Sequence, residues 1–126
     1  MKTIPTEGIP TQASNPAGHS AVVTLDGRCF DGIVLERGKT AGDSDTLVFE
    51  GGRFRSTACD RYGYGDGAYT AAVLADAIAF EAETESAKYG KLIWRGTIRG
   101  PRLDGTLAMV RDGVAAGEKW VLAGER

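Results

Sequence analysis

The fold is decided by residues 78–110, which read IAFEAETESAKYGKLIWRGTIRGPRLDGTLAMV. Apolar and charged residues alternate from Ile78 to Glu85, and the segment from Lys91 to Arg99 alternates in the same way. A period of two is typical of strands that bury one face. The stretch therefore predicts consecutive antiparallel strands.

Two hairpins bring all the apolar residues of this stretch onto one face. A turn through residues 86–90 and a two-residue loop at Gly100-Pro101 give one consistent register. It pairs Glu85 with Lys91, Glu81 with Arg95, Ala82 with Trp94, Phe80 with Gly96, Ile98 with Leu103, Gly96 with Gly105, Trp94 with Leu107 and Leu92 with Met109. A slip of one residue would place glutamates opposite Trp94, so this register is strongly specified. We expect Glu81, Glu83 and Glu85 to form a solvated outer face with ion pairs, because catalytic carboxylates need to converge in a partly desolvated cleft.

The same reasoning extends the strand pattern in both directions. Residues 20–36 predict an opening strand that is kinked or split near Asp26-Gly27, followed by a polar loop over 37–45. Residues 46–58 predict a hairpin around Gly51-Gly52, with Phe49 opposite Phe54 inside, and residues 69–74 predict a strand that turns near 75–76. A last turn through 112–117 brings Trp120 and Leu122 beside Met109 and Leu107 on the inner face.

Eight strands with short connections predict an all-β fold, an eight-stranded antiparallel up-and-down β-barrel, which removes its edges by closing. The alternative is a two-sheet β-sandwich of the same strands. The predicted interior mixes large residues such as Phe80 and Trp94 with small ones such as Ala71 and Gly96. We favour a filled or nearly filled barrel for this mixture, and the alternative is a cavity lined by Trp94, Tyr69 and Trp120 for an apolar or aromatic ligand.

Composition limits the domain organisation and the partners. The chain of 126 residues has room for one domain, which we place at residues 20–126. Residues 1–19 hold three of the four prolines and predict a flexible N-terminal arm. The formal charge of −2 gives no reason to expect nucleic acid, and no apolar run is long enough for a membrane span.

Residues 59–69, CDRYGYGDGAY, are not explained by barrel building. Their tyrosines and glycines suit a recognition surface or lid at the barrel mouth, or a connection in which tyrosines cap the barrel and Asp60 pairs with Arg61. Cys29 and Cys59 could form one disulfide or remain unbridged. Cys59 beside Arg61 suggests a lowered thiol pKa, although no base accompanies it.

Catalytic and cofactor motifs are not evident in the sequence. The only histidine is His19, and the spacing of acidic residues and glycines fits neither a metal site nor a phosphate-binding loop. We therefore expect no metal, no cofactor and no catalytic residues. The remaining enzymatic hypothesis is an isomerase or hydrolase with Asp60, Asp66 or Tyr69 as acid or base.

Part of the chain resembles a group of small bacterial proteins, generally uncharacterised and often exported, with lipocalin-like or calycin-like barrels. The matching residues are Ser56-x-x-Cys59, Tyr62-Gly63-Tyr64, Tyr69, Phe80-x-Ala82-x-Thr84-x-Ser86, Trp94-x-Gly96-x-Ile98-x-Gly100 and Gly105. The chain lacks the glycine-x-tryptophan signature of true lipocalins in its first strand. The resemblance implies a barrel and a periplasmic or secreted location.

Two functions follow as expectations. The first is binding of a small apolar or aromatic ligand in the barrel or at its mouth, by Tyr62, Tyr64, Tyr69, Trp94, Trp120, Asp60 and Arg61. The alternative is an interaction module for a protein or glycan partner, which uses the tyrosine-rich segment and holds no internal ligand.

Overall fold

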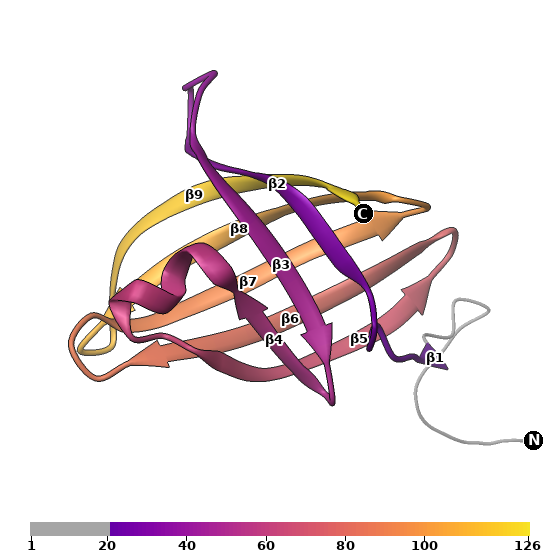
Figure 1. Cartoon of the computed structure of the whole chain (residues 1–126), viewed down its shortest axis with the longest axis horizontal. Helices are drawn as coiled ribbons and strands as arrows, with labels where there is room; N and C mark the ends of the chain where they lie inside the picture. Colours follow the sequence, from indigo (N-terminus) through magenta and orange to yellow (C-terminus); the bar gives the residue numbers. More distant parts are fainter. Residues whose placement is uncertain (1–20) are drawn as a thin grey trace, which may run out of the picture.

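The computed structural model describes residues 21–126 and shows a closed eight-stranded antiparallel up-and-down β-barrel with one short additional strand (Figure 1). The predicted fold class is confirmed, and the sandwich alternative is not observed. The predicted arm, residues 1–19, lies outside the described residues. The elements are β1 (Ala21–Val22), β2 (Cys29–Glu36), β3 (Asp43–Glu50), β4 (Arg53–Ser56), the 3₁₀-helix η2 (Thr57–Tyr62), β5 (Asp66–Leu74), β6 (Ala77–Ser86), β7 (Gly90–Arg99), β8 (Arg102–Arg111) and β9 (Val114–Glu125).

The barrel closes because each strand from β2 to β9 pairs with the next, and β9 pairs back with β2. The additional strand β1 pairs with β5 through two residues. The connections alternate between the two ends of the barrel. The β2–β3 loop, η2 and the β6–β7 and β8–β9 turns lie at one end, and the other turns and the C-terminus lie at the opposite end (Figure 1).

The predicted register of β5 to β8 is confirmed at every pair. Phe80 lies opposite Gly96, Ala82 opposite Trp94, and Gly96 opposite Gly105. The outer ladder is also present, with an ion pair between Arg95 and Glu81. Lys91 lies opposite Glu85 in the register, but its ammonium pairs diagonally with Glu83 at 3.2 Å.

The predicted inner face of β9 is wrong. Met109 pairs with Gly117 and Val110 with Ala115, so a β-bulge leaves Ala116 unpaired. Because one extra residue reverses which side chains point inward, Val121 is buried on the inner face, and Trp120 and Leu122 lie on the outer face, 41% and 39% exposed.

Several element boundaries also differ from the prediction. The strand β3 begins at Asp43, and β4 ends at Ser56, where η2 replaces the rest of the predicted strand. The predicted loop 59–69 is thus partly the helix η2 and partly the first residues of β5. The opening strand is split into β1 and β2, as the turn signal at Asp26-Gly27 indicates.

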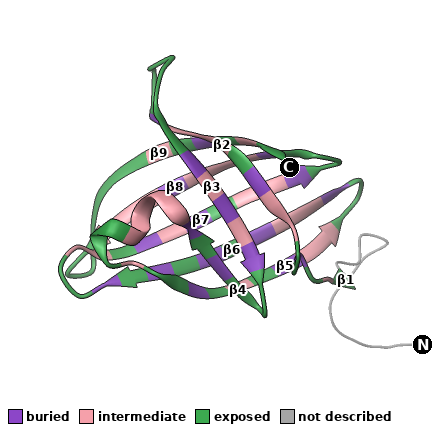
Figure 2. Cartoon of the chain, in the orientation of Figure 1, coloured by how far each residue is buried: buried purple, intermediate pink, exposed green. Residues whose placement is uncertain are grey.

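The centre of the barrel is filled with aromatic and aliphatic side chains. Buried residues alternate with exposed ones along the strands (Figure 2). The rings of Phe49, Phe54 and Phe80 pack at centroid distances of 5.2 to 6.2 Å, and Trp94 packs on Phe54 at 4.9 Å. Phe80 occupies the space that a side chain at Gly96 would need, because a Cβ there would lie 2.8 Å from the Phe80 ring. The centre therefore matches the filled-barrel interpretation.

One end of the barrel is closed by residues 23–28, which we call the plug loop. Leu25 in this loop is fully buried against the core. Backbone hydrogen bonds attach the loop to the barrel, from Val23 N–H to Ala71 O at 3.1 Å and from Gly27 N–H to Phe49 O at 2.8 Å.

Candidate functional site

A pocket of about 310 Å³ opens at the barrel end opposite the plug loop. We call it the mouth pocket. Its floor is apolar, and η2 and the β6–β7 turn form part of its wall. It is lined by Val34, Asp43, Ser44, Asp45, Ala58, Cys59, Arg61, Tyr62, Tyr64, Tyr89, Leu92, Trp94, Leu107, Met109 and Lys119. Its volume falls at the lower end of the range for small-molecule sites.

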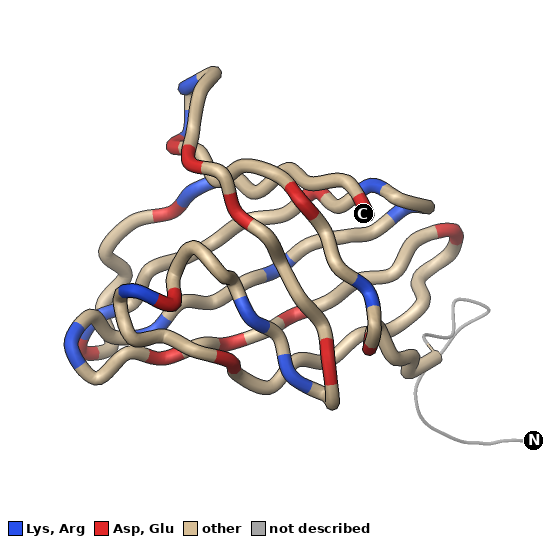
Figure 3. Tube along the Cα trace, in the orientation of Figure 1, with Lys and Arg blue, Asp and Glu red and all other residues tan. Residues whose placement is uncertain are grey.

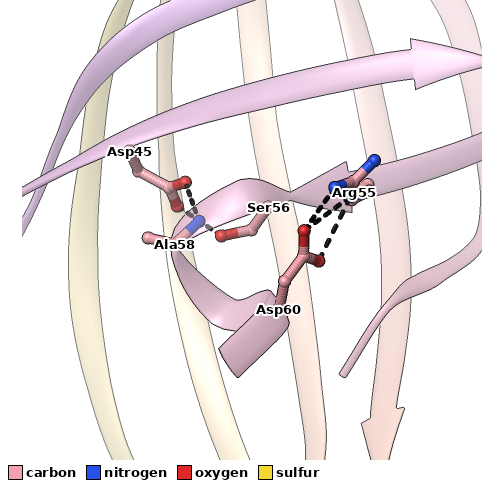
Figure 4. Close-up of polar contacts among 5 residues, drawn as sticks. All are labelled: Asp45, Arg55, Ser56, Ala58 and Asp60. Atoms are coloured by element: carbon pink, nitrogen blue, oxygen red, sulfur yellow. Dashed lines mark hydrogen bonds and ion pairs between the residues drawn. The ribbon is translucent and has the colours of Figure 1, made fainter. Parts of the chain in front are cut away.

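The helix η2 is attached to the barrel at its first turn (Figure 4). The buried carboxylate of Asp45 accepts a hydrogen bond from the Ser56 hydroxyl and one from Ala58 N–H at 3.0 Å. On the outer side, the Arg55 guanidinium pairs with Asp60. These contacts position η2 over the mouth, since residues 57–62 contain no fully buried side chain that could do so.

The end of η2 is held by the β6–β7 turn. The buried hydroxyl of Ser86 donates to Tyr62 O at 2.8 Å and accepts from Lys88 N–H at 3.2 Å. The ring of Tyr89 packs edge-on against Tyr62 and is stacked with Tyr64, at centroid distances of 5.8 and 6.5 Å. Tyr62, Tyr64 and Tyr89 therefore form one connected wall at this end of the barrel.

The floor of the pocket is apolar and consists of buried side chains. Trp94 is 1% exposed, and its indole N–H donates to the Thr84 hydroxyl at 3.3 Å. Leu92 and Leu107 lie beside it and are buried. An indole ring whose polar atom is already bonded presents an apolar surface to a ligand.

Two cationic side chains line the mouth pocket. Lys119 is half-buried on the inner face of β9, opposite Leu107, and Arg61 is exposed on η2 with its guanidinium 5.2 Å from the Tyr62 ring. Within residues 21–126, neither side chain has an ion-pair partner. Of the two lining carboxylates, Asp45 is occupied by its hydrogen bonds, and Asp43 lies exposed at the rim.

Cys59 lies in the wall as a free thiol, and Cys29 is also free. Cys29 begins β2 near the plug loop and Cys59 lies at the other end, so the unbridged alternative is the one observed. Burial raises the pKa of the Cys59 thiol, and the neighbouring carboxylate of Asp45 adds to the increase. The expectation of a lowered pKa is wrong, because desolvation outweighs the nearby positive charge of Lys119.

The structure brings four of the seven predicted ligand-binding residues together. Tyr62, Tyr64, Trp94 and Arg61 all line the mouth pocket. Tyr69 lies at the opposite end, where its hydroxyl donates to Asp26 at 2.7 Å and accepts from Leu25 N–H at 2.8 Å. Trp120 is on the outer face of β9, and Asp60 is outside the pocket in an ion pair with Arg55 rather than the predicted pair with Arg61.

Sequence reasoning missed Lys119, Asp45 and Met109 as lining residues. Lys119 was missed because the prediction placed it on the outer face of β9. Asp45 was missed because residues 37–45 were assigned to a loop. The signal that could have revealed Asp45 is its alternation with Leu47 and Phe49 on the inner face of β3.

The acid–base hypothesis is not supported by the arrangement of its three residues. Asp66 pairs with Arg53 at 3.0 Å, Asp60 pairs with Arg55, and Tyr69 is bonded to Asp26 at the other end of the barrel. No group of three or more histidine, cysteine or acidic residues within 21–126 is arranged to hold a metal ion. In the same part of the chain, no helix has the length and apolar character to cross a membrane.

A larger hollow of about 680 Å³ lies on the outer face of β5 to β8. It is shallow and open, and its rim includes small outward residues such as Thr70, Ala72 and Thr97. Because an open surface of small side chains excludes little water from a ligand, the mouth pocket is the better candidate site.

Comparisons of the chain with models of protein families, with curated proteins and with solved structures find no match.

Proposed function

We propose that this protein binds a small, largely apolar or aromatic ligand in the mouth pocket. The observation that carries the proposal is the combination of a filled barrel centre with an unfilled pocket at the end opposite the plug loop, whose floor is Trp94, Leu92 and Leu107. An apolar concavity beside a few polar groups is the usual form of a small-molecule site.

A second candidate is contact with a protein or glycan through the tyrosine-rich segment. One observation favours it: the Tyr62 ring is 45% exposed next to the Arg61 guanidinium, and both residue types are common interface anchors. The candidate ranks second because the neighbouring Tyr64 packs against Tyr89 and contributes to the pocket wall.

The proposed function is tested by titration with phenylnaphthylamine, a neutral aromatic probe whose fluorescence increases in apolar surroundings. We expect saturable binding to the unmodified protein. Met109→Trp should fill the pocket with a larger ring and weaken binding by about tenfold or more, since Met109 is partly buried in its wall. Native mass spectrometry of the purified protein would reveal a co-purified natural ligand.

The matched control is Trp120→Gln, which removes the exposed aromatic ring from the outer face of β9. It should leave the affinity for the probe unchanged. If Trp120→Gln abolishes binding and Met109→Trp does not, the probe binds the outer surface and the proposal is wrong. Circular dichroism melts of both variants confirm that the barrel is folded.

A further inference from the structure

We infer that the ligand of the mouth pocket is amphipathic, with an apolar or aromatic body and an anionic head group that Lys119 binds. The inference rests on the proposed function, and it specifies the ligand class.

The inner face of β9 carries Lys119 next to apolar residues on two sides. Val121 is 3% exposed and packs in the core, and Leu107 lies directly across from Lys119 on β8. On its other side Lys119 lies across from the exposed Glu36 on β2, which forms no ion pair with it. Lysine is rarely placed on a buried face, because its ammonium loses hydration there unless it finds a partner. The methylene stem can cover apolar surface while the ammonium stays near water at the mouth.

The ammonium of Lys119 has no ion-pair partner among residues 21–126, although most arginines of the barrel have one. Arg28, Arg53 and Arg55 each pair with a carboxylate within 3.0 Å. Lys119 and Arg61 are the two cations that line the pocket, and both are left unpaired there. An anionic group that enters the mouth would meet both charges.

The surroundings of the pocket add further positive charge. Lys88 Nζ and Arg111 Cζ lie 5.3 and 6.0 Å from the centre of the Tyr89 ring, which forms part of the wall. Figure 3 shows basic residues on η2 and on the β6–β7 and β8–β9 connections, together with acidic ones. Of the carboxylates that line the pocket, Asp45 is already hydrogen-bonded, so the opposing charges are Asp43 at the rim and Glu36, which lies outside the pocket across from Lys119 on β2.

The shape of the pocket completes the argument. The cations lie in the wall and the floor is apolar, so a ligand with its charge at one end satisfies both regions at once. A neutral ligand would leave the Lys119 ammonium facing an apolar body, and a fully polar anion would leave the floor around Trp94 without a partner.

The test compares two probes that share one ring system, phenylnaphthylamine and its sulfonated form, anilinonaphthalene sulfonate. Lys119→Met, which keeps the length of the stem and removes the charge, should weaken binding of the sulfonate by about fivefold and change binding of the neutral probe by less than about twofold. Lys119→Arg keeps the positive charge and should bind the sulfonate about as tightly as the unmodified protein. Asp43→Asn should strengthen it, because it removes the opposing charge.

The control is Lys91→Met, which removes the same charge from the outer face of the barrel, where Lys91 pairs with Glu83. It should alter neither affinity. If the neutral probe binds at the mouth and Lys119→Met weakens both probes equally or neither, the anionic head group is wrong while the proposed function stands. If Met109→Trp weakens the binding of neither probe, the probes do not bind in the mouth pocket. The proposed function then fails, and the inference fails with it.

Discussion

The hydroxyl group of Tyr69 shows how a single atom can attach a loop to the barrel. It donates to Asp26 at 2.7 Å and accepts from Leu25 N–H at 2.8 Å, so it holds the plug loop against the inner face of β5. The sequence placed Tyr69 inside the barrel correctly, because the alternation of β5 indicates its face. Its role could not be predicted, since the partner residues lie more than forty positions away and carry no periodic signal.

At this scale we predict that Tyr69→Phe destabilises the protein by about 1 kcal/mol through the lost bond to Leu25 N–H, and further through the lost bond to Asp26, which depends on pH. The hydrogen bond from Tyr69 is the main reason that the pKa of the Asp26 carboxyl lies below its ordinary value of 3.8. A lowered pKa in the folded state contributes stability above the unfolded pKa, and this contribution is lost as the pH falls through the folded pKa.

The difference between the two melting temperatures should therefore be largest near neutral pH and become smaller as the pH falls through the lowered pKa of Asp26, leaving the part that comes from the lost bond to Leu25 N–H. Tyr64→Phe, which removes the same atom at the other end of the barrel, is the control and should show no such decrease. A difference that stays constant from neutral to acidic pH would show that Asp26 is not the partner that matters.

At the scale of elements, the sequence predicted β5 to β8 accurately and failed at β9. Strict alternation with glutamates on one face specifies the register of β6 and β7, because a slip would bury charge. In β9 the segment Val114 to Gly117 offers no such penalty, and the bulge that leaves Ala116 unpaired reverses the rest of the strand. The helix η2 was missed for a related reason: its residues have no periodicity, and hydrogen bonds to Asp45 hold its first turn.

The register of β9 is tested by the same substitution at adjacent positions. Val121→Asn should destabilise the protein by about 3 kcal/mol, because it buries an amide without a partner in the apolar core. Leu122→Asn should cost less than about 1 kcal/mol, since Leu122 lies 39% exposed on the outer face. Urea unfolding of both variants measures the two effects, and the reverse order would favour the register without a bulge.

For the whole molecule, closure of the barrel followed from the strand pattern, and a filled centre was the favoured one of two interpretations of the interior residues. The difference between the two ends of the barrel was not predicted. One end is closed by the plug loop and the other carries the mouth pocket, and both depend on segments without alternation, residues 23–28 and 57–65. Between them lies the aromatic layer of Phe49, Phe54 and Phe80. This arrangement separates the end of the barrel that the plug loop closes from the end that holds the mouth pocket.

The separation predicts that the two ends respond independently to substitution. Leu25→Ala removes a fully buried side chain from the plug loop and should destabilise the protein by about 3 kcal/mol. It should leave the affinity for phenylnaphthylamine at the mouth unchanged, because the aromatic layer stays packed between the new cavity and the pocket. Met109→Trp should have the opposite effects: it should lower the affinity for the probe and change the melting temperature little. Calorimetry and probe titration on each variant and on the double variant measure whether the two effects are independent. A loss of probe affinity in Leu25→Ala would show that the core transmits changes from one end of the barrel to the other.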